Sequence, residues 1–189
     1  MSSGADSLLA LLEPEDGGEG APGSVLAAEG VRLARALGVS VHLATWPKSA
    51  GSDLEALASA AADLAGRTRP AAVILADTDA GRQLAPMIAH RLGCGCVNGC
   101  SDVLVRGGTL VFVKPVYGGW LEQEVEPVPG TVPVATLDLA GLEAPALTAD
   151  RLPLPEVLQV EVSSAERVRR LELIPPDPRS VDLSTRDAS

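Results

Sequence analysis

Residues 71–76 have the sequence AAVILA, an apolar run without a polar interruption. A run of this length with branched residues at its centre favours a strand, and the lack of alternation indicates that both faces of the strand are buried. Strands of this kind are typical of parallel sheets that carry helices on both faces. We therefore expect helices on either side of this segment in the chain.

The residues before this strand alternate between strand and helix patterns. Ser24, Ser52 and Asp53 are side-chain types that cap helix N-termini, and they precede apolar stripes at helical spacing. The expected elements are a strand at 7–12, a helix at 24–37, a strand at 39–44 and a helix from 52 or 53 to 66. Because strands and helices alternate, the sequence predicts a parallel sheet with right-handed crossovers.

The residues after this strand change from helix to β patterns. A helix is expected at 84–92, and the pair Gly107-Gly108 between apolar residues indicates a hairpin. The expected β segments are 102–105, 110–114, 121–126, 132–137, 157–162 and 168–173. We therefore predict an α/β fold with a parallel sheet flanked by helices and an additional β-rich C-terminal half. Residues 1–174 are expected to form one domain, and residues 175–189 a polar tail.

The charge of the chain argues against two classes of partner. The sequence has 25 Asp and Glu residues against 15 Lys and Arg residues, a formal net charge of -10. An acidic surface repels both the phosphate backbone of nucleic acids and anionic lipid. No apolar run approaches the roughly 20 residues that span a bilayer, and the first residues lack the basic region of a signal peptide. We expect a cytoplasmic protein that binds neither nucleic acid nor membrane.

Residues 18–23 fit the pattern G-x-G-x-x-G between a strand and a helix, which is the setting of a dinucleotide-binding loop. Glu13, Glu15, Asp16 and Glu19 place negative charge where a pyrophosphate would bind. No acidic residue follows the second strand to hold a ribose. We interpret this segment as a flexible loop.

The cysteines and histidines do not form a recognisable catalytic or metal motif. Cys94, Cys96 and Cys100 could supply three thiolates, but a closed zinc site needs four ligands and only His90 is nearby. His42 lies in a strand pattern without a nucleophile motif around it. We expect small structural cysteines and no metal, and we rank an enzyme that uses His42 or a cysteine low.

Gly81 and Arg82 are candidates for contacts at the edge of the sheet. Because Pro is best tolerated in the first turn of a helix, Pro86 predicts that both residues lie in the loop after the third strand. In open α/β sheets, ligands and partners bind at that edge. Two interpretations remain open: Arg82 contacts a ligand or partner, or it pairs with Asp77 or Asp79 on the surface.

Several motifs resemble those of electron transfer flavoprotein alpha subunits. Residues 76–93 are similar to the signature helix of that family, whose usual wording is close to G-R-D-L-A-P-R-x-A-A-R-L-G. Residues 98–101, NGCS, lie where the family commonly has D-C-T, and residues 114–120, KPVYGGW, are similar to its R-P-A-Y-G-G-N loop. Residues 174–183 are similar to the segment that leads into the family's FAD-binding domain, and the sequence stops at Ser189, where that domain would begin.

The resemblance implies the N-terminal domain of such an alpha subunit, a Rossmann-like domain of the adenine-nucleotide alpha hydrolase type. Such a domain packs on a beta subunit as a docking and scaffold component of an electron-transfer assembly, without an active site of its own. FAD would belong to the assembly and be held mainly by a separate FAD-binding domain. The candidate interface residues are Gly81, Arg82, Lys114, Tyr117, Gly118, Gly119 and Trp120.

The loop at residues 114–120 contains five of these candidates. Gly118-Gly119 allows a sharp turn, and Tyr117 and Trp120 place two of the four aromatic residues beside it. The rings either contact a partner or pack into the core of this domain. The alternative function is a nucleotide or small-molecule binding module with the same fold and no electron transfer.

Overall fold

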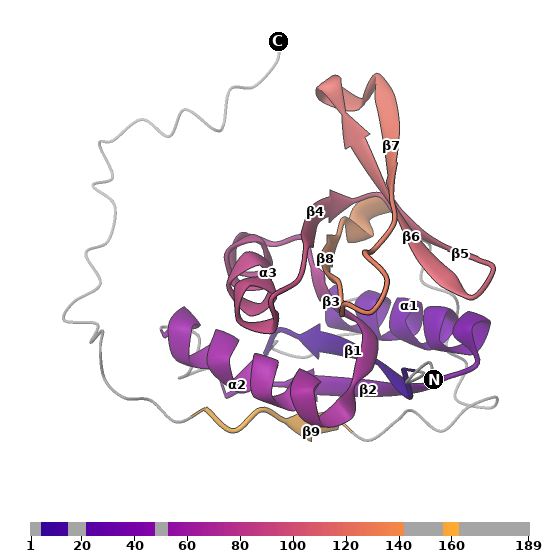
Figure 1. Ribbon diagram of the computed structural model, residues 1–189. Coiled ribbons are helices and arrows are strands. Elements are labelled where there is room, and N and C mark those ends of the chain that lie inside the picture. The colour runs from indigo at the N-terminus through magenta and orange to yellow at the C-terminus, as the bar shows by residue number, and fades with distance from the viewer. Residues whose placement is uncertain (1–4, 15–21, 48–52, 142–156, 163–189) are drawn as a thin grey trace, which may run out of the picture.

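The computed structural model describes residues 5–14, 22–47, 53–141 and 157–162. Six strands form a parallel sheet in the order β4-β8-β3-β1-β2-β9 (Figure 1). They are β1 (Ser7–Leu12), β2 (Ser40–Thr45), β3 (Pro70–Ala76), β4 (Cys96–Cys100), β8 (Val134–Leu137) and β9 (Val157–Gln159). The expected Rossmann-like parallel sheet is confirmed.

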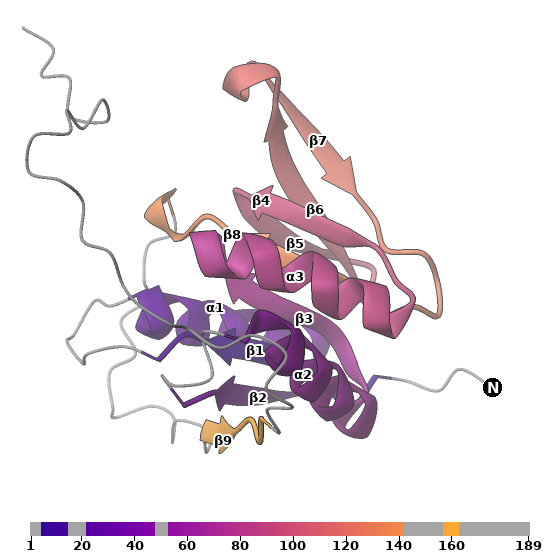
Figure 2. The same cartoon turned by 90° about the vertical axis from the view of Figure 1, so that its left-hand side faces the viewer.

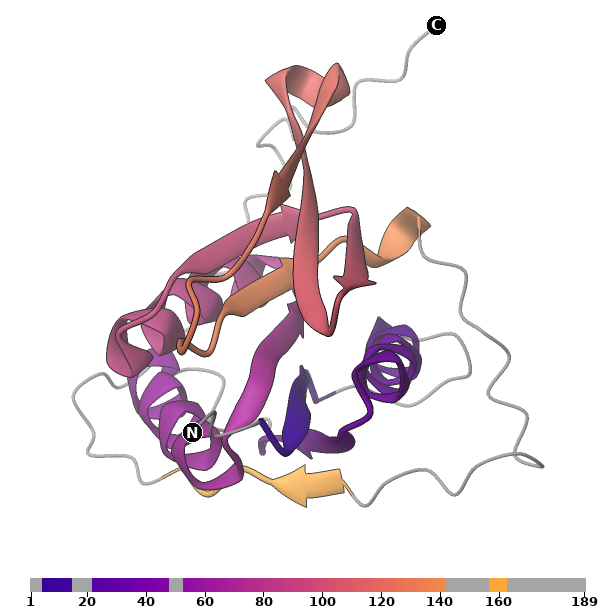
Figure 3. The ribbon, with the colours of Figure 1, turned by 45° about the vertical axis from the view of Figure 1, so that its right-hand side comes forward.

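Three helices cover the two faces of this sheet, as Figure 3 shows. α1 (Pro22–Leu37) lies on one face, and α2 (Leu54–Thr68) and α3 (Asp79–Leu92) lie on the other. Alternate residues of each central strand enter the two cores: in β1, Leu8 packs on the α1 side and Leu9 on the α2 and α3 side. Burial on both faces is the reason why the central strands are apolar throughout.

The N-terminal ends of two helices differ in how well the sequence predicted them. Asp53 caps α2, where its Oδ1 accepts a hydrogen bond from the Ala56 N–H at 3.0 Å, as expected. α1 begins at Pro22, so the prediction that Ser24 caps this helix is wrong, and Ser24 lies inside the helix. Proline is favourable at the first helical position because that position needs no N–H donor.

A three-stranded antiparallel sheet connects β4 to β8 in place of a crossover helix. It consists of β5 (Asp102–Arg106), β6 (Thr109–Val116) and β7 (Leu121–Val125) and confirms the expected hairpin at Gly107-Gly108. The lower part of this sheet packs into the core on the α1 face through Val103, Leu110 and Phe112. The additional β-rich region of the prediction is therefore present.

An ion pair on α1 holds this small sheet to the body. Glu29 is buried, and both of its carboxylate oxygens accept hydrogen bonds from Arg32, at 2.5 and 2.7 Å. The same guanidinium donates to the Val103 carbonyl of β5 at 2.7 Å. Because an unpaired buried carboxylate is costly, the pair fixes Arg32 in the position that reaches β5.

The segment expected at 157–162 forms the short strand β9, which pairs with β2. Its expected partner strand at 168–173 and the polar tail at 175–189 lie outside the described residues. Within the part of the chain that the structure describes, every helix is too short or too polar to span a bilayer. The η3 turn (Leu139–Gly141) ends the continuous part of the fold after β8.

Candidate functional site

The upper part of the β6–β7 hairpin projects away from the body, as Figures 1 and 2 show. β5 pairs with β6 only as far as Val113, so residues 114–123 form a two-stranded ribbon, which we call the arm. Lys114 pairs with Gln123 at the stem of the arm, and Val116 pairs with Leu121 near its tip. A two-stranded ribbon alone is marginally stable in water, so contact with another surface would stabilise it.

The tip of the arm has an unusual backbone. The turn η2 (Tyr117–Gly119) contains three consecutive residues with positive φ, at 53° for Tyr117, 68° for Gly118 and 88° for Gly119. Glycine adopts this conformation freely, whereas a residue with a Cβ atom pays about 1 kcal/mol for it. Strain of this kind is concentrated at functional sites, which makes Tyr117 a candidate contact residue.

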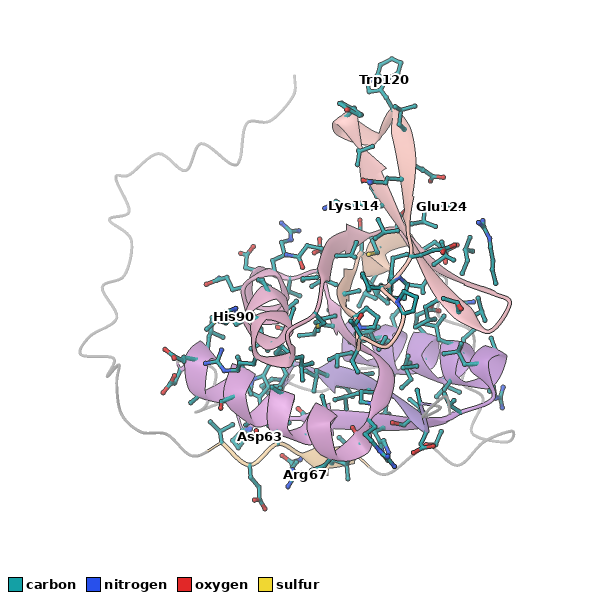
Figure 4. All side chains as sticks on the ribbon, viewed as in Figure 1. Asp63, Arg67, His90, Lys114, Trp120 and Glu124 are labelled. Carbon is teal, nitrogen blue, oxygen red and sulfur yellow. The ribbon has the colours of Figure 1, made fainter. Side chains whose placement is uncertain are left out.

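The aromatic side chains of the arm point into water. Tyr117 is 80% exposed, Trp120 is 88% exposed and Leu121 is 59% exposed. Figure 4 shows Trp120 at the end of the arm that lies farthest from the body. The possibility that both rings pack into this domain's own core is therefore wrong. Large apolar side chains gathered at one exposed tip are typical of a protein contact site.

Lys114 lies at the stem of the arm and influences two thiols of β4. Burial raises the pKa of Cys96 to about 11 and that of Cys100 to about 12, and the nearby Lys114 ammonium acts in the opposite direction on both. Burial raises the pKa of Cys94 as well. All three thiols are therefore protonated at neutral pH, and a protonated thiol is a poor nucleophile and a poor metal ligand.

The three cysteines are free thiols. Within the described ranges, no three His, Cys, Asp or Glu side chains come together as a metal site would need. His42 lies on β2, and His90 lies on the exposed side of α3, away from the arm (Figure 4). The structural, metal-free role of the cysteines stays a prediction.

Gly81 and Arg82 lie in the first turn of α3, not in a loop as expected. The helix begins at Asp79, and the hydroxyl of the N-cap residue Thr78 accepts a hydrogen bond from the Gly81 N–H at 2.9 Å. Gly81 is buried, and a Cβ atom there would lie 2.0 Å from the Ala76 carbonyl oxygen. A glycine is therefore required for the close packing of α3 on β3.

α3 can begin at Asp79, before the predicted start at residue 84, because Pro86 is tolerated in its interior. The missing N–H of Pro86 would have bonded the carbonyl of Arg82, four residues earlier. The Asn98 side-chain amide of β4 donates to that carbonyl instead, at 3.2 Å. A side chain from another element thus replaces the lost helical hydrogen bond, and the sequence pattern around Pro86 could not show it.

Arg82 pairs with Asp77, which is one of the two interpretations left open by the sequence. Its Nε donates to Asp77 Oδ2 at 3.0 Å, and its Nη2 donates to the Asp77 carbonyl at 3.1 Å. The Arg82 side chain is 57% exposed, so it remains accessible to a partner. Of the seven candidates, Arg82 and Gly81 lie on α3, and the other five lie on the arm.

A hydrogen-bond network that was not predicted from the sequence lies behind this ion pair. The buried Thr136 hydroxyl donates to Asp77 Oδ1 at 2.5 Å and accepts from the Gly99 N–H at 2.8 Å. Asp77 directly follows β3, Thr136 lies in β8 and Gly99 lies in β4, so together they connect the carboxyl ends of these strands. The signal that could have found them is a threonine in the apolar run Val134–Leu137. Asp77 and Lys114 both influence Cys100, so the network adjoins the stem of the arm.

β2 and β3 lie on opposite sides of β1, so the strand order reverses between β1 and β3. In folds of this kind, ligands usually bind at the carboxyl ends of the two strands that flank such a reversal. Here the Thr78 hydroxyl donates to the Glu13 carboxylate and bridges the two strands. The loop at 15–21 that carries most of the G-x-G-x-x-G pattern lies outside the described residues. The Glu13 carboxylate places a negative charge where a phosphate would need a positive one.

Two comparisons with known proteins relate this chain to one family. The profile of the electron transfer flavoprotein domain matches residues 18–163. The chain belongs to the electron transfer flavoprotein domain family. It is 32% identical over 117 residues to the electron transfer flavoprotein subunit alpha of Bacillus subtilis (strain 168). That match covers 61% of this chain and 35% of the relative, so the family resemblance concerns an alpha-subunit-like N-terminal domain.

Proposed function

We propose that this chain is a docking and scaffold domain of an electron-transfer assembly, and that its arm packs against a beta-like subunit. The observation that carries the proposal is the pair of aromatic rings exposed at the strained tip of the arm. Aromatic side chains are enriched at the centres of protein interfaces, and their burial supplies much of the binding free energy. Arg82, half exposed at the neighbouring sheet edge, would contribute to the same contact.

Electron transfer in this proposal is a property of the assembly. FAD would be held mainly by an FAD-binding domain, while this domain would act without catalytic residues. The described residues support this division because the exposed rings lie at the end of a projecting arm and the thiols of β4 are protonated. We expect the purified chain to carry no stoichiometric FAD, and a flavin absorption spectrum at one equivalent would contradict this.

A nucleotide-binding module of the same fold is the alternative, and the sheet edge offers it little support. The Glu13 carboxylate and the Thr78 hydroxyl are already bonded to each other at the position where a nucleotide would bind. A phosphate there would have to displace Glu13 and overcome its charge. Calorimetric titration with AMP and ATP separates the two functions, since tight binding to this chain favours the alternative.

The docking proposal is tested by truncating Trp120. We expect Trp120→Ala to weaken binding of the beta-like subunit encoded in the same genome by about 2 kcal/mol, because a central interface aromatic would be lost. Affinity can be measured by calorimetry, and thermal unfolding of the same variant monitors the fold. Val128, which is 69% exposed on a different loop, provides the control substitution Val128→Ala. Unchanged affinity in Trp120→Ala would rule out this interface.

A further inference from the structure

We infer that the partner surface facing the arm is an apolar socket surrounded by basic side chains. This inference rests on the docking function proposed above and adds the chemistry of the partner. The socket receives the tip, where Trp120 and Leu121 expose most of their surface. The basic side chains around the socket are inferred from the acidic residues that follow the tip along the chain, which are separate from the exposed aromatic rings.

The acidic residues of β7 lie on one face of the strand. Glu122 and Glu124 alternate with Leu121, Gln123 and Val125, so these two carboxylates share one side of the strand, and Glu126 follows directly after the last residue of β7. All three glutamates are exposed. This places a row of negative charge directly behind the aromatic tip, as the position of Glu124 below Trp120 in Figure 4 illustrates.

Only part of this negative charge is compensated within the chain. The Arg106 guanidinium binds both carboxylate oxygens of Glu124, at 2.5 and 2.6 Å, and attracts Glu126 more weakly. No ion pair among the described residues includes Glu122 or Glu126. Three carboxylates therefore face one guanidinium. The face keeps a net negative charge that a basic partner surface would complement.

A second copy of this chain fits this surface poorly. The chain carries a formal net charge of -10, so two copies repel each other at long range. Arm-to-arm contact would also bring Glu122 and Glu126 of both copies together, and like charges in contact disfavour association. An anionic membrane would be repelled for the same reason. A different protein with a basic contact surface is the occupant that the charges favour.

The experiment measures association rates with the beta-like subunit encoded in the same genome. The double variant Glu122→Gln/Glu126→Gln removes the two carboxylates that make no ion pair, without changing the shape of the arm. We expect it to lower the association rate on the order of tenfold at low salt. The difference from the unmodified chain should disappear as salt rises from about 0.1 M to about 1 M, because the ions screen the attraction.

The matched control is Asp63→Asn/Glu161→Gln, which changes the net charge by the same amount at exposed positions on α2 and after β9. Figure 4 shows Asp63 on the opposite end of the molecule from the arm. Equal losses of rate in both double variants would show that only the overall charge matters and would overturn the inference.

The Trp120→Ala variant separates this inference from the proposed function. If Trp120→Ala weakens binding and Glu122→Gln/Glu126→Gln does not alter the rate, the arm docks but the basic surround is wrong. If neither variant alters binding, the docking function itself fails. The inference is supported if Trp120→Ala weakens binding and Glu122→Gln/Glu126→Gln lowers the association rate. The control Asp63→Asn/Glu161→Gln should change neither.

Discussion

The lower and upper halves of the β6–β7 hairpin have opposite relations to water. Phe112, in the lower half, is fully buried against the α1 face of the sheet, whereas Trp120, eight residues later, is 88% exposed. In the described body, no buried side-chain nitrogen or oxygen lacks a hydrogen-bond partner. No residue of the arm, 114–123, is buried. The body is thus stabilised by its own contacts, whereas the arm leaves its aromatic side chains exposed to water.

The largest expected effect separates the two halves directly. Phe112→Ala should lower the free energy of unfolding by about 4 kcal/mol, because it opens a cavity in a packed core. Trp120→Ala should change it by less than about 0.5 kcal/mol, as at other surface positions. Urea unfolding of both variants provides the measurement. Similar losses in the two variants would mean that the arm packs on the body in solution.

A smaller loss in the free energy of unfolding is expected when the hydrogen-bond network of Asp77, Thr136 and Gly99 is broken. Thr136→Val should cost about 2 kcal/mol, since it leaves Asp77 Oδ1 and the Gly99 N–H without their buried partner. Thr136→Ser retains the hydroxyl and serves as the control. Thermal unfolding should rank the chains as unmodified, Ser and then Val. A Val variant as stable as the Ser variant would show that the hydroxyl does not stabilise the body.

The smallest change in the free energy of unfolding at neutral pH is expected from the thiols near the stem of the arm. Their ordinary pKa is 9.0, and burial raises it to about 11 for Cys96 and about 12 for Cys100. The unfolded chain therefore loses these protons first, so the contribution of the two thiols to the free energy of unfolding should be constant below pH 9 and fall as pH rises from 9 towards 12. Cys96→Ala/Cys100→Ala should show a smaller decline, and an identical decline would contradict the assignment.

The sequence predicted the body well because its signals are local. Apolar runs located β1, β2, β3, β8 and β9 to within a few residues, and alternation of strands and helices predicted a parallel sheet. The strand β4 was not predicted, because its sequence CVNGC is short and contains Asn and Gly, which are depleted in strands. The predicted start of α3 was wrong because the prediction relied on Pro86. Asn98 of β4, which is distant in sequence, replaces the hydrogen bond that Pro86 cannot make, so the proline is tolerated inside the helix. The Asp77, Thr136 and Gly99 network likewise joins residues that are distant in sequence.

The arm shows a different limit of sequence analysis. The composition around Tyr117 and Trp120 suits a buried core and a protein interface equally, because both environments favour aromatic residues. What decides between them is that β5 begins at Asp102, opposite Val113, so the part of β6 beyond Val113 pairs with β7 alone. The exposure of the rings therefore follows from the relative lengths of three strands, which residue types alone do not specify.

The position of β8 has a consequence for how the chain folds. β8 lies between β3 and β4 in the sheet, yet it follows both of them in the chain, after the whole antiparallel hairpin. In the described sheet, β4 pairs only with β8, so β4 has no strand neighbour until β8 is inserted. Non-local pairing of this kind is slow because the intervening chain must first be ordered. The antiparallel insertion therefore determines when the last gap in the parallel sheet can close.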